Sequence, residues 1–260
     1  MFFDSCAHPT INGEWAEGRR GITFKELAAS REKNPGYMAL AIGLPGVGAY
    51  EHAAFKRECE RWGFLAIAAI TTVAEVDLMR EFETIVRLGF RGVKVHPRLL
   101  RRNTDHSYLK TIFTLCRRHG LVCLLCTYEW DAPGNLPNSD PFYQLCEALN
   151  LAPDIKLVLM HGGGLRLAQF ASLARHSESI LLDLSFTLTD YLTAPLLDSL
   201  TTTLIENLDQ RVCIGTDSPE NSIEEVLYRF KELTKSIDAN KVENVMSRNL
   251  LRFFPEAVQR

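Results

Sequence analysis

The chain alternates short apolar runs with longer amphipathic stretches, and this alternation repeats eight times. The apolar runs have the length of a strand, and Gly, Pro, Asp or Asn residues bound them. Strands that are apolar on both faces are typical of buried parallel sheets. The predicted strands cover Met1–Cys6, Tyr37–Gly43, Phe64–Thr71, Gly92–His96, Leu121–Cys126, Ile155–His161, Ile180–Ser185 and Val212–Thr216.

A helix-length stretch follows each run, with apolar residues at helical spacing, as at Val76, Met79 and Phe82. The predicted helices cover Thr23–Lys33, His52–Trp62, Ala74–Leu88, Tyr108–His119, Pro141–Leu149, Leu165–His176, Ala194–Asn207, Ile223–Ser236 and Asn240–Phe253. Eight such units close a barrel more readily than they extend an open sheet, and no Gly-x-Gly-x-x-Gly turn follows the first strand. No linker rich in Pro, Gly or Ser divides the chain. We therefore expect residues 1–260 to form an α/β protein, a single-domain (β/α)8 TIM barrel.

Composition narrows the class of protein. A formal net charge of −3 provides no basic field, which argues against nucleic acid as a partner. No apolar run approaches the length of a membrane span, and the first ten residues lack the regions of a secretory signal. Seven cysteines, several within apolar runs such as LVCLLC, indicate free thiols in a reducing compartment. We expect a cytoplasmic protein with a small-molecule substrate and no membrane partner, and base rates favour a homodimer.

Residues of types that can take part in catalysis or bind a metal lie where the predicted strands end. In a barrel of this kind the functional side chains come from the carboxyl ends of the strands. Strand alternation places Cys6 and His8 on one face, and Lys94 and His96 on one face of another strand. Polar residues at further strand ends are Cys126, His161, Asp183 and Asp217. We expect these side chains to converge on one pocket.

Five motifs occur in the order DSCAHP, GFRGVKVHP, KLVLMHGGG, GTDSPE and NVMSRNLLRFF. In this order the chain resembles the amidohydrolase-related (amidohydrolase 2) family of the amidohydrolase superfamily. The resemblance runs across nearly the whole chain. It implies a (β/α)8 barrel enzyme, mostly a metal-dependent hydrolase, with some decarboxylases and a few lactonases that work without metal. It also implies a metal held by a His-x-His pair on the first strand, a histidine on the fifth and an aspartate on the eighth, with a sixth-strand histidine nearby.

Two of the implied metal ligands differ in this chain. His8, His161 and Asp217 match the family pattern, but Cys6 and Cys126 stand where histidines are expected. Thiolate is a good zinc ligand, so Cys6, His8, Cys126 and Asp217 form one candidate zinc site. In the alternative, both cysteines are small buried thiols and the pocket holds no metal, because cysteine is among the most often buried residues.

The remaining roles each have a structural alternative. Asp217 is the candidate general base as well as a metal ligand, but an aspartate here could simply cap the next helix. His161 is the second catalytic candidate, to polarise a carbonyl or relay a proton, unless it only bonds backbone. Lys94, His96 and Arg98 are candidates for substrate binding, because Arg98 opens a cationic loop suited to a carboxylate or phosphate. That loop continues through Arg101 and Arg102, and Glu129 and Asp183 are further candidate carboxylates.

Together these residues predict an amidohydrolase-like hydrolase acting on a small carboxylated or phosphorylated metabolite, with or without zinc. Two alternatives remain open within the enzyme class: a decarboxylase or other lyase, and a metal-free lactonase. Outside that class, the chain could be a non-catalytic barrel that has lost its metal site.

Overall fold

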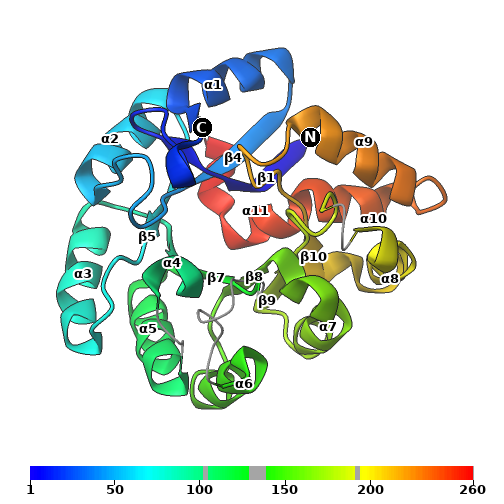
Figure 1. The fold of residues 1–260 in the computed structure, drawn as a ribbon. Coiled ribbons are helices and arrows are strands. Elements are labelled where there is room, and N and C mark those ends of the chain that lie inside the picture. Colours follow the sequence, from blue (N-terminus) through cyan, green and yellow to red (C-terminus); the bar gives the residue numbers. More distant parts are fainter. Residues whose placement is uncertain (102–104, 129–138, 191–193, 260) are drawn as a thin grey trace.

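The computed structural model describes residues 1–101, 105–128, 139–190 and 194–259. Eight strands form one sheet in the order β1-β4-β5-β6-β7-β8-β9-β10, and helices surround it (Figure 1). The strands are β1 Phe2–Ala7, β4 Tyr37–Ile42, β5 Leu65–Ala69, β6 Gly92–Val95, β7 Val122–Cys126, β8 Leu157–Met160, β9 Ile180–Asp183 and β10 Val212–Cys213. The outer helices are α1 Phe24–Lys33, α2 His52–Trp62, α3 Glu75–Arg87, α5 His106–His119, α6 Pro141–Leu151, α7 Leu167–His176, α8 Ala194–Leu208 and α9 Ile223–Leu233. All neighbouring strands run parallel, which confirms the predicted (β/α)8 barrel.

The barrel closes between its first strand and the segment that follows its last. The amide of Ser5 donates to the carbonyl of Ile214 at 3.2 Å, and the amide of His8 donates to that of Ser218 at 2.9 Å. Ala7 and Ser218 pair as a parallel bridge. Residues at the end of β1 are therefore brought beside residues that are more than 200 positions away in the chain.

Strand alternation divides the core into two layers. Val93 and Val95 of β6 pack in the layer between strands and helices, so Lys94 between them faces the barrel interior. On β7 the interior-facing residues are Val122 and Leu124, and Cys126 continues that face at the strand end. The predicted polar side chains thus lie in the barrel interior near the carboxyl ends of the strands.

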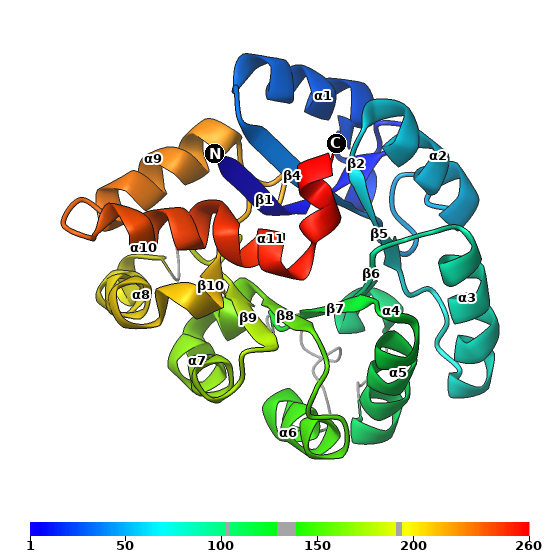
Figure 2. The same ribbon diagram turned by 180° about the vertical axis from the view of Figure 1, so that it is seen from behind.

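The amino-terminal end of the barrel is covered by the last helical segment. This segment comprises α10 Ala239–Glu243, the π-helical turn Asn244–Arg248 and α11 Asn249–Phe253. Figure 2 shows α11 crossing this end, where Leu250 and Phe253 join the interior cluster around Phe3. The carboxyl ends of the strands therefore form the end of the barrel that this segment leaves uncovered.

The sequence pattern missed three short features. The strands β2 Pro9–Thr10 and β3 Ile22–Thr23 form a separate two-stranded sheet, and α4 Pro97–Leu100 follows β6. The single helix expected over Asn240–Phe253 is divided by the π-helical turn. Elements of two to four residues are too short to show a hydrophobic period, so the pattern could not reveal them.

No helix in the described part of the chain is both long and apolar enough to cross a membrane. Two of the residues singled out above, Arg102 and Glu129, lie outside the described residues.

Candidate active site

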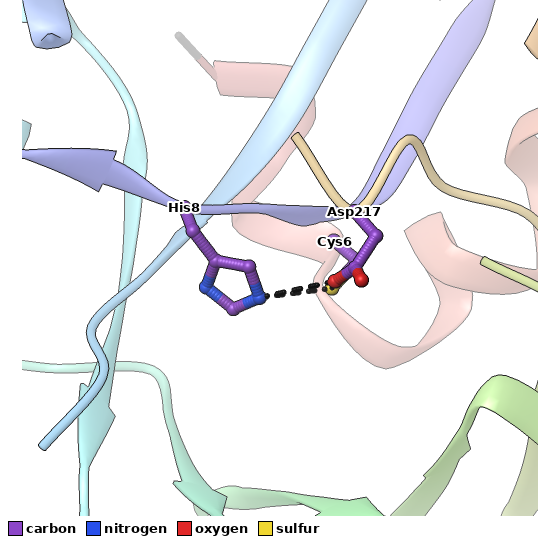
Figure 3. A group of neighbouring side chains, drawn as sticks. All are labelled: Cys6, His8 and Asp217. Carbon is purple, nitrogen blue, oxygen red and sulfur yellow. Dashed lines mark hydrogen bonds and ion pairs between the residues drawn. The ribbon is translucent and has the colours of Figure 1, made fainter. Parts of the chain in front are cut away.

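Three predicted ligands meet at the seam where the barrel closes (Figure 3). Cys6 Sγ lies 3.3 Å from His8 Nε2 and 3.1 Å from Asp217 Oδ1. His8 Nε2 lies 3.3 Å from the same carboxylate oxygen. Cys6 and His8 are buried, and the Asp217 side chain is 16% exposed. One sulfur, one nitrogen and one oxygen therefore form a triangle that is reached from the carboxyl end of the barrel.

Local backbone geometry places these three atoms. Cys6 and His8 are two residues apart in extended chain, so both point to one side of β1. Asp217 has a left-handed backbone with φ 52°, which turns its side chain back toward β1. The turn is held by the amide of Ser218, which donates to Thr216 Oγ1 at 3.0 Å. Aspartate tolerates this conformation better than most residues, which fits its use here.

The triangle fits a zinc ion. Tetrahedral zinc, with bonds of about 2.3 Å to sulfur and about 2.1 Å to nitrogen or oxygen, holds ligand atoms about 3.4–3.6 Å apart. The three observed separations, 3.1, 3.3 and 3.3 Å, are all shorter than those values, and the sulfur–oxygen pair is the shortest, so a bound ion would spread the three atoms slightly. His8 Nδ1 donates to the carbonyl of Ile42 at 2.9 Å, which leaves the Nε2 lone pair for a metal. Three protein ligands leave a fourth position for water, as catalytic zinc sites require.

Charge in the cluster is concentrated on Asp217. Burial raises the pKa of the Cys6 thiol well above its usual value, and the nearby Asp217 charge raises it further. The thiol accordingly donates to Asp217 Oδ1. Burial would also favour the neutral acid of Asp217, but the positive field of His161 and the adjacent His8 imidazole outweigh it and hold that pKa well below its usual range. Asp217 is therefore a carboxylate at neutral pH, as a base or a ligand must be.

The fourth predicted ligand, Cys126, has different neighbours. Among the described residues, the cluster of potential ligand atoms within 4.8 Å of one another contains only Cys6, His8 and Asp217. Burial opposes ionisation of Cys126, yet the imidazoles of His96 and His161 lower the pKa of its thiol well below the usual value. Its role as a zinc ligand stays a prediction, and the geometry groups it with the two histidines.

His161 is fixed by hydrogen bonds at the end of β8. Its Nδ1 donates to the carbonyl of Ser185 at 3.1 Å, and its amide donates to Asp183 Oδ2 at 3.2 Å. The Asp183 carboxylate also accepts from the hydroxyls of Ser5 and Ser185. Burial favours neutral imidazole, but Asp217 and Cys126 raise the pKa of His161 above its usual value. Asp183, fully buried, is thus a support for His161 rather than a carboxylate of the cleft.

A cleft of about 330 Å³ opens over the cluster. The residues that line this cleft include the predicted site residues His8, Lys94, His96, Arg98, His161 and Asp217. Cys6 and Cys126 lie beneath this surface, at 0% and 4% exposure. The structure therefore brings the candidate catalytic and substrate-binding residues to one cleft.

One wall of the cleft was not predicted from the sequence. Trp15 packs its ring 5.8 Å from that of His8, and its Nε1 donates to Glu220 at 2.8 Å. Arg19 pairs with the same carboxylate at 2.7 Å. Tyr128 and Phe186 form another part of the wall, with ring centroids 5.1 Å apart. These residues lie in loops after strands. That position is the only sign of their role in the sequence, and it does not distinguish them from other loop residues.

Comparison with known proteins agrees with this geometry. The amidohydrolase family profile matches residues 28–255. The chain belongs to the amidohydrolase family. The match covers His96, His161 and Asp217, although it begins after Cys6 and His8. No curated protein matches the chain.

Solved structures show that the barrel fold extends over nearly the whole chain. An uncharacterized TIM-barrel protein from Bordetella bronchiseptica has a TM-score of 0.79 at 16% identity, covering 99% of both chains. A D-hydantoinase has a TM-score of 0.65 at 11% identity, covering 98% of this chain and 72% of its own. A protein engineered for organophosphate hydrolysis from a weak promiscuous lactonase template has a TM-score of 0.59 at 14% identity, covering 96% and 95%. At these identities the likeness concerns the fold.

Proposed function

We propose that this amidohydrolase-family chain is a hydrolase acting on a small carboxylated or phosphorylated metabolite, with Asp217 as the general base. The observation that carries the proposal is the Asp217 carboxylate, which lies at the cleft floor and contacts His8 and Cys6. Its low pKa keeps it ionised at neutral pH, the form in which a carboxylate can bind a metal or accept a proton. His161 donates through Nδ1 to the carbonyl of Ser185, and its raised pKa favours the imidazolium, whose Nε2–H can polarise the scissile carbonyl.

The same site is suited to zinc through Cys6, His8 and Asp217. When bound, zinc would lower the pKa of a water molecule and act as a Lewis acid. The protein itself orients His8 through Ile42, restricts water to a narrow cleft and places the base beside the reacting group. Lys94, His96 and Arg98 are the proposed substrate-binding residues, because all three line the cleft.

We also infer the setting in which this enzyme works. All seven cysteines are free thiols, which supports a reducing, cytoplasmic location. The net charge of −3 supports a small-molecule substrate rather than nucleic acid. A homodimer remains the oligomeric state that base rates favour.

The test is hydrolysis of a panel of small carboxylated and phosphorylated esters, lactones and amides by the wild type and two variants. Asp217→Asn removes the base, and we expect kcat to fall by roughly 10²–10⁴-fold. His161→Ala should lower kcat by about 10²-fold or more. Asp154→Asn, on an aspartate whose side chain is 81% exposed, is the matched control and should leave kcat unchanged. Full activity in Asp217→Asn would refute the assignment of the base.

A further inference from the structure

The Lys94 side chain is a buried cation whose terminal atom has no partner in the described part of the chain. Lys94 is 0% exposed, and its Nζ makes no hydrogen bond to any described residue. The side chain extends from the inward face of β6 and lines the cleft. An isolated ammonium in a protein interior costs several kcal/mol unless an anion or hydrogen-bond acceptors compensate it. An acceptor supplied by a ligand would therefore stabilise this side chain.

The other cationic side chains of the cleft have described partners. Arg19 forms two hydrogen bonds with the carboxylate of Glu220, at 2.7 and 3.1 Å. Arg98 lies over the ring of Tyr128, 5.1 Å from its centroid. Arg19 is also more than half exposed, so water already solvates it. Among the cations that line the cleft, Lys94 is the one that a bound anion would stabilise most.

The charge of Lys94 acts close to the proposed base. It contributes to the low pKa of Asp217 and opposes the rise in the pKa of Cys6, so its ammonium lies within electrostatic range of both. No ion pair joins Lys94 to Asp217 among the described residues, so their charged atoms lie more than 4.0 Å apart. An anion bound at Lys94 is thus near the atoms that react.

The surroundings favour a singly charged anion. One ammonium compensates one negative charge, and the Asp217 carboxylate nearby repels a second. Lys94 alone compensates only one of the two charges of a phosphate dianion. A carboxylate carries one charge and two acceptor oxygens, which match an ammonium with three unused donors.

We propose that Lys94 binds a substrate carboxylate that lies within a few bonds of the group that is hydrolysed. The position relative to the scissile bond rests on the proposed function, whereas binding of a carboxylate at Lys94 does not. Lys94 is then the specificity-determining residue of the cleft, and phosphorylated compounds are the poorer ligands.

The test measures binding to metal-free protein by isothermal titration calorimetry, so that it does not depend on turnover. Benzoate, benzamide and phenyl phosphate are matched probes, with a ring suited to the walls at Trp15, Tyr128 and Phe186. We expect the wild type to bind benzoate at least tenfold more tightly than either other probe. Lys94→Met keeps the length of the side chain, and it should bind benzoate and benzamide within about threefold of each other.

Two controls separate binding from folding. Lys110→Met, on an exposed lysine of α5, should keep the tenfold preference for benzoate. Lys94→Met should unfold at a temperature equal to or above that of the wild type, because a buried unpaired charge has been removed. Lys94→Gln gives a second neutral variant and should likewise lose the preference.

A retained tenfold preference in both Lys94→Met and Lys94→Gln would overturn the assignment, as would tighter binding of phenyl phosphate than of benzoate by the wild type. Loss of turnover in every assay with intact benzoate binding would refute the proposed hydrolase and leave the carboxylate site standing. Turnover without a preference for benzoate would refute the carboxylate site and leave the proposed hydrolase standing.

Discussion

Two cysteines at the carboxyl end of the barrel differ in what surrounds their sulfur atoms. The Cys6 thiol lies within 3.3 Å of a nitrogen and an oxygen that are both capable of binding metal. The Cys126 thiol belongs to a separate group with His96 and His161. The two positions look equivalent in the family pattern, yet the structure gives them different partners.

This difference predicts the outcome of metal analysis on two serine variants. Protein purified without chelator should contain about one zinc per chain, and Cys6→Ser should lose most of it because one of three ligands is removed. Cys126→Ser should keep at least most of the zinc, since its sulfur is not part of the cluster. Cys59→Ser, on a buried cysteine of α2, is the control for thiol removal alone. Equal loss of zinc in both site variants would restore Cys126 as a fourth ligand, and wild type without zinc would exclude the metal site.

At the scale of single residues, the sequence predicted most of the cleft floor and little of its wall. Cys6, His8 and Asp217 were predictable because strand ends of a parallel barrel must converge. Their pairwise contacts were not, because these depend on the left-handed backbone at Asp217. The contact between Trp15 and His8 depends on the path of a loop, which no hydrophobic period records.

At the scale of elements, the helix and strand boundaries follow from physical signals that a sequence carries. The helix α2 begins at His52, after Glu51 accepts from two backbone amides, and it ends at Trp62, before Gly63 with φ 72°. Apolar period and terminal residues together define such a helix. The glycine run after β8 was also readable as a sharp turn, but the contacts that it permits were not.

The second glycine of this run, Gly163, sits where a side chain does not fit. Its φ is 77°, and a Cβ there would lie 2.2 Å from the buried ring of Phe170 on α7. Gly163→Ala should therefore lower the free energy of unfolding by about 1–3 kcal/mol more than a glycine variant with backbone strain alone. It should also reduce activity, because the same turn positions His161.

The matched variant is Gly120→Ala at the end of α5. Gly120 has φ 65°, but apart from its two chain neighbours no described residue has an atom within 4 Å of the position that a Cβ would take. Urea denaturation of both variants separates the strain that they share from the steric clash that they do not. Equal destabilisation would show that Phe170 moves aside at little cost.

At the scale of the whole molecule, one buried carboxylate, that of Asp4, connects the first strand to the segments on both sides of it. Asp4 on β1 accepts from the amide and the hydroxyl of Thr216, at 2.8 and 2.7 Å, after the last strand. It also accepts from Tyr37 Oη at 2.8 Å on β4 and from the amide of Cys6 at 3.0 Å. One side chain thereby joins β1 to both neighbouring segments, directly beneath the candidate site.

This arrangement predicts how stability depends on pH. Burial raises the pKa of Asp4 from 3.8 to about 6, although its hydrogen bonds act in the opposite direction. Because the folded protein holds this proton more tightly than the unfolded chain, the contribution of Asp4 to stability is greatest below pH 3.8. It is lost as the pH rises toward 6. Between pH 4 and pH 7 the loss is on the order of 2 kcal/mol.

Asp4→Asn isolates this effect, because asparagine has the same shape and does not titrate. The other titrating groups contribute to both proteins, so they cancel when the free energies of unfolding are subtracted at each pH. Measured by urea denaturation in the presence of a chelator, the wild type should lose stability relative to Asp4→Asn as the pH rises from 4 to 7. A difference that is constant over this range would mean that Asp4 keeps an ordinary pKa, and that its four donors compensate fully for burial. A difference that grows in favour of the wild type would mean that the ionised carboxylate itself holds the seam closed.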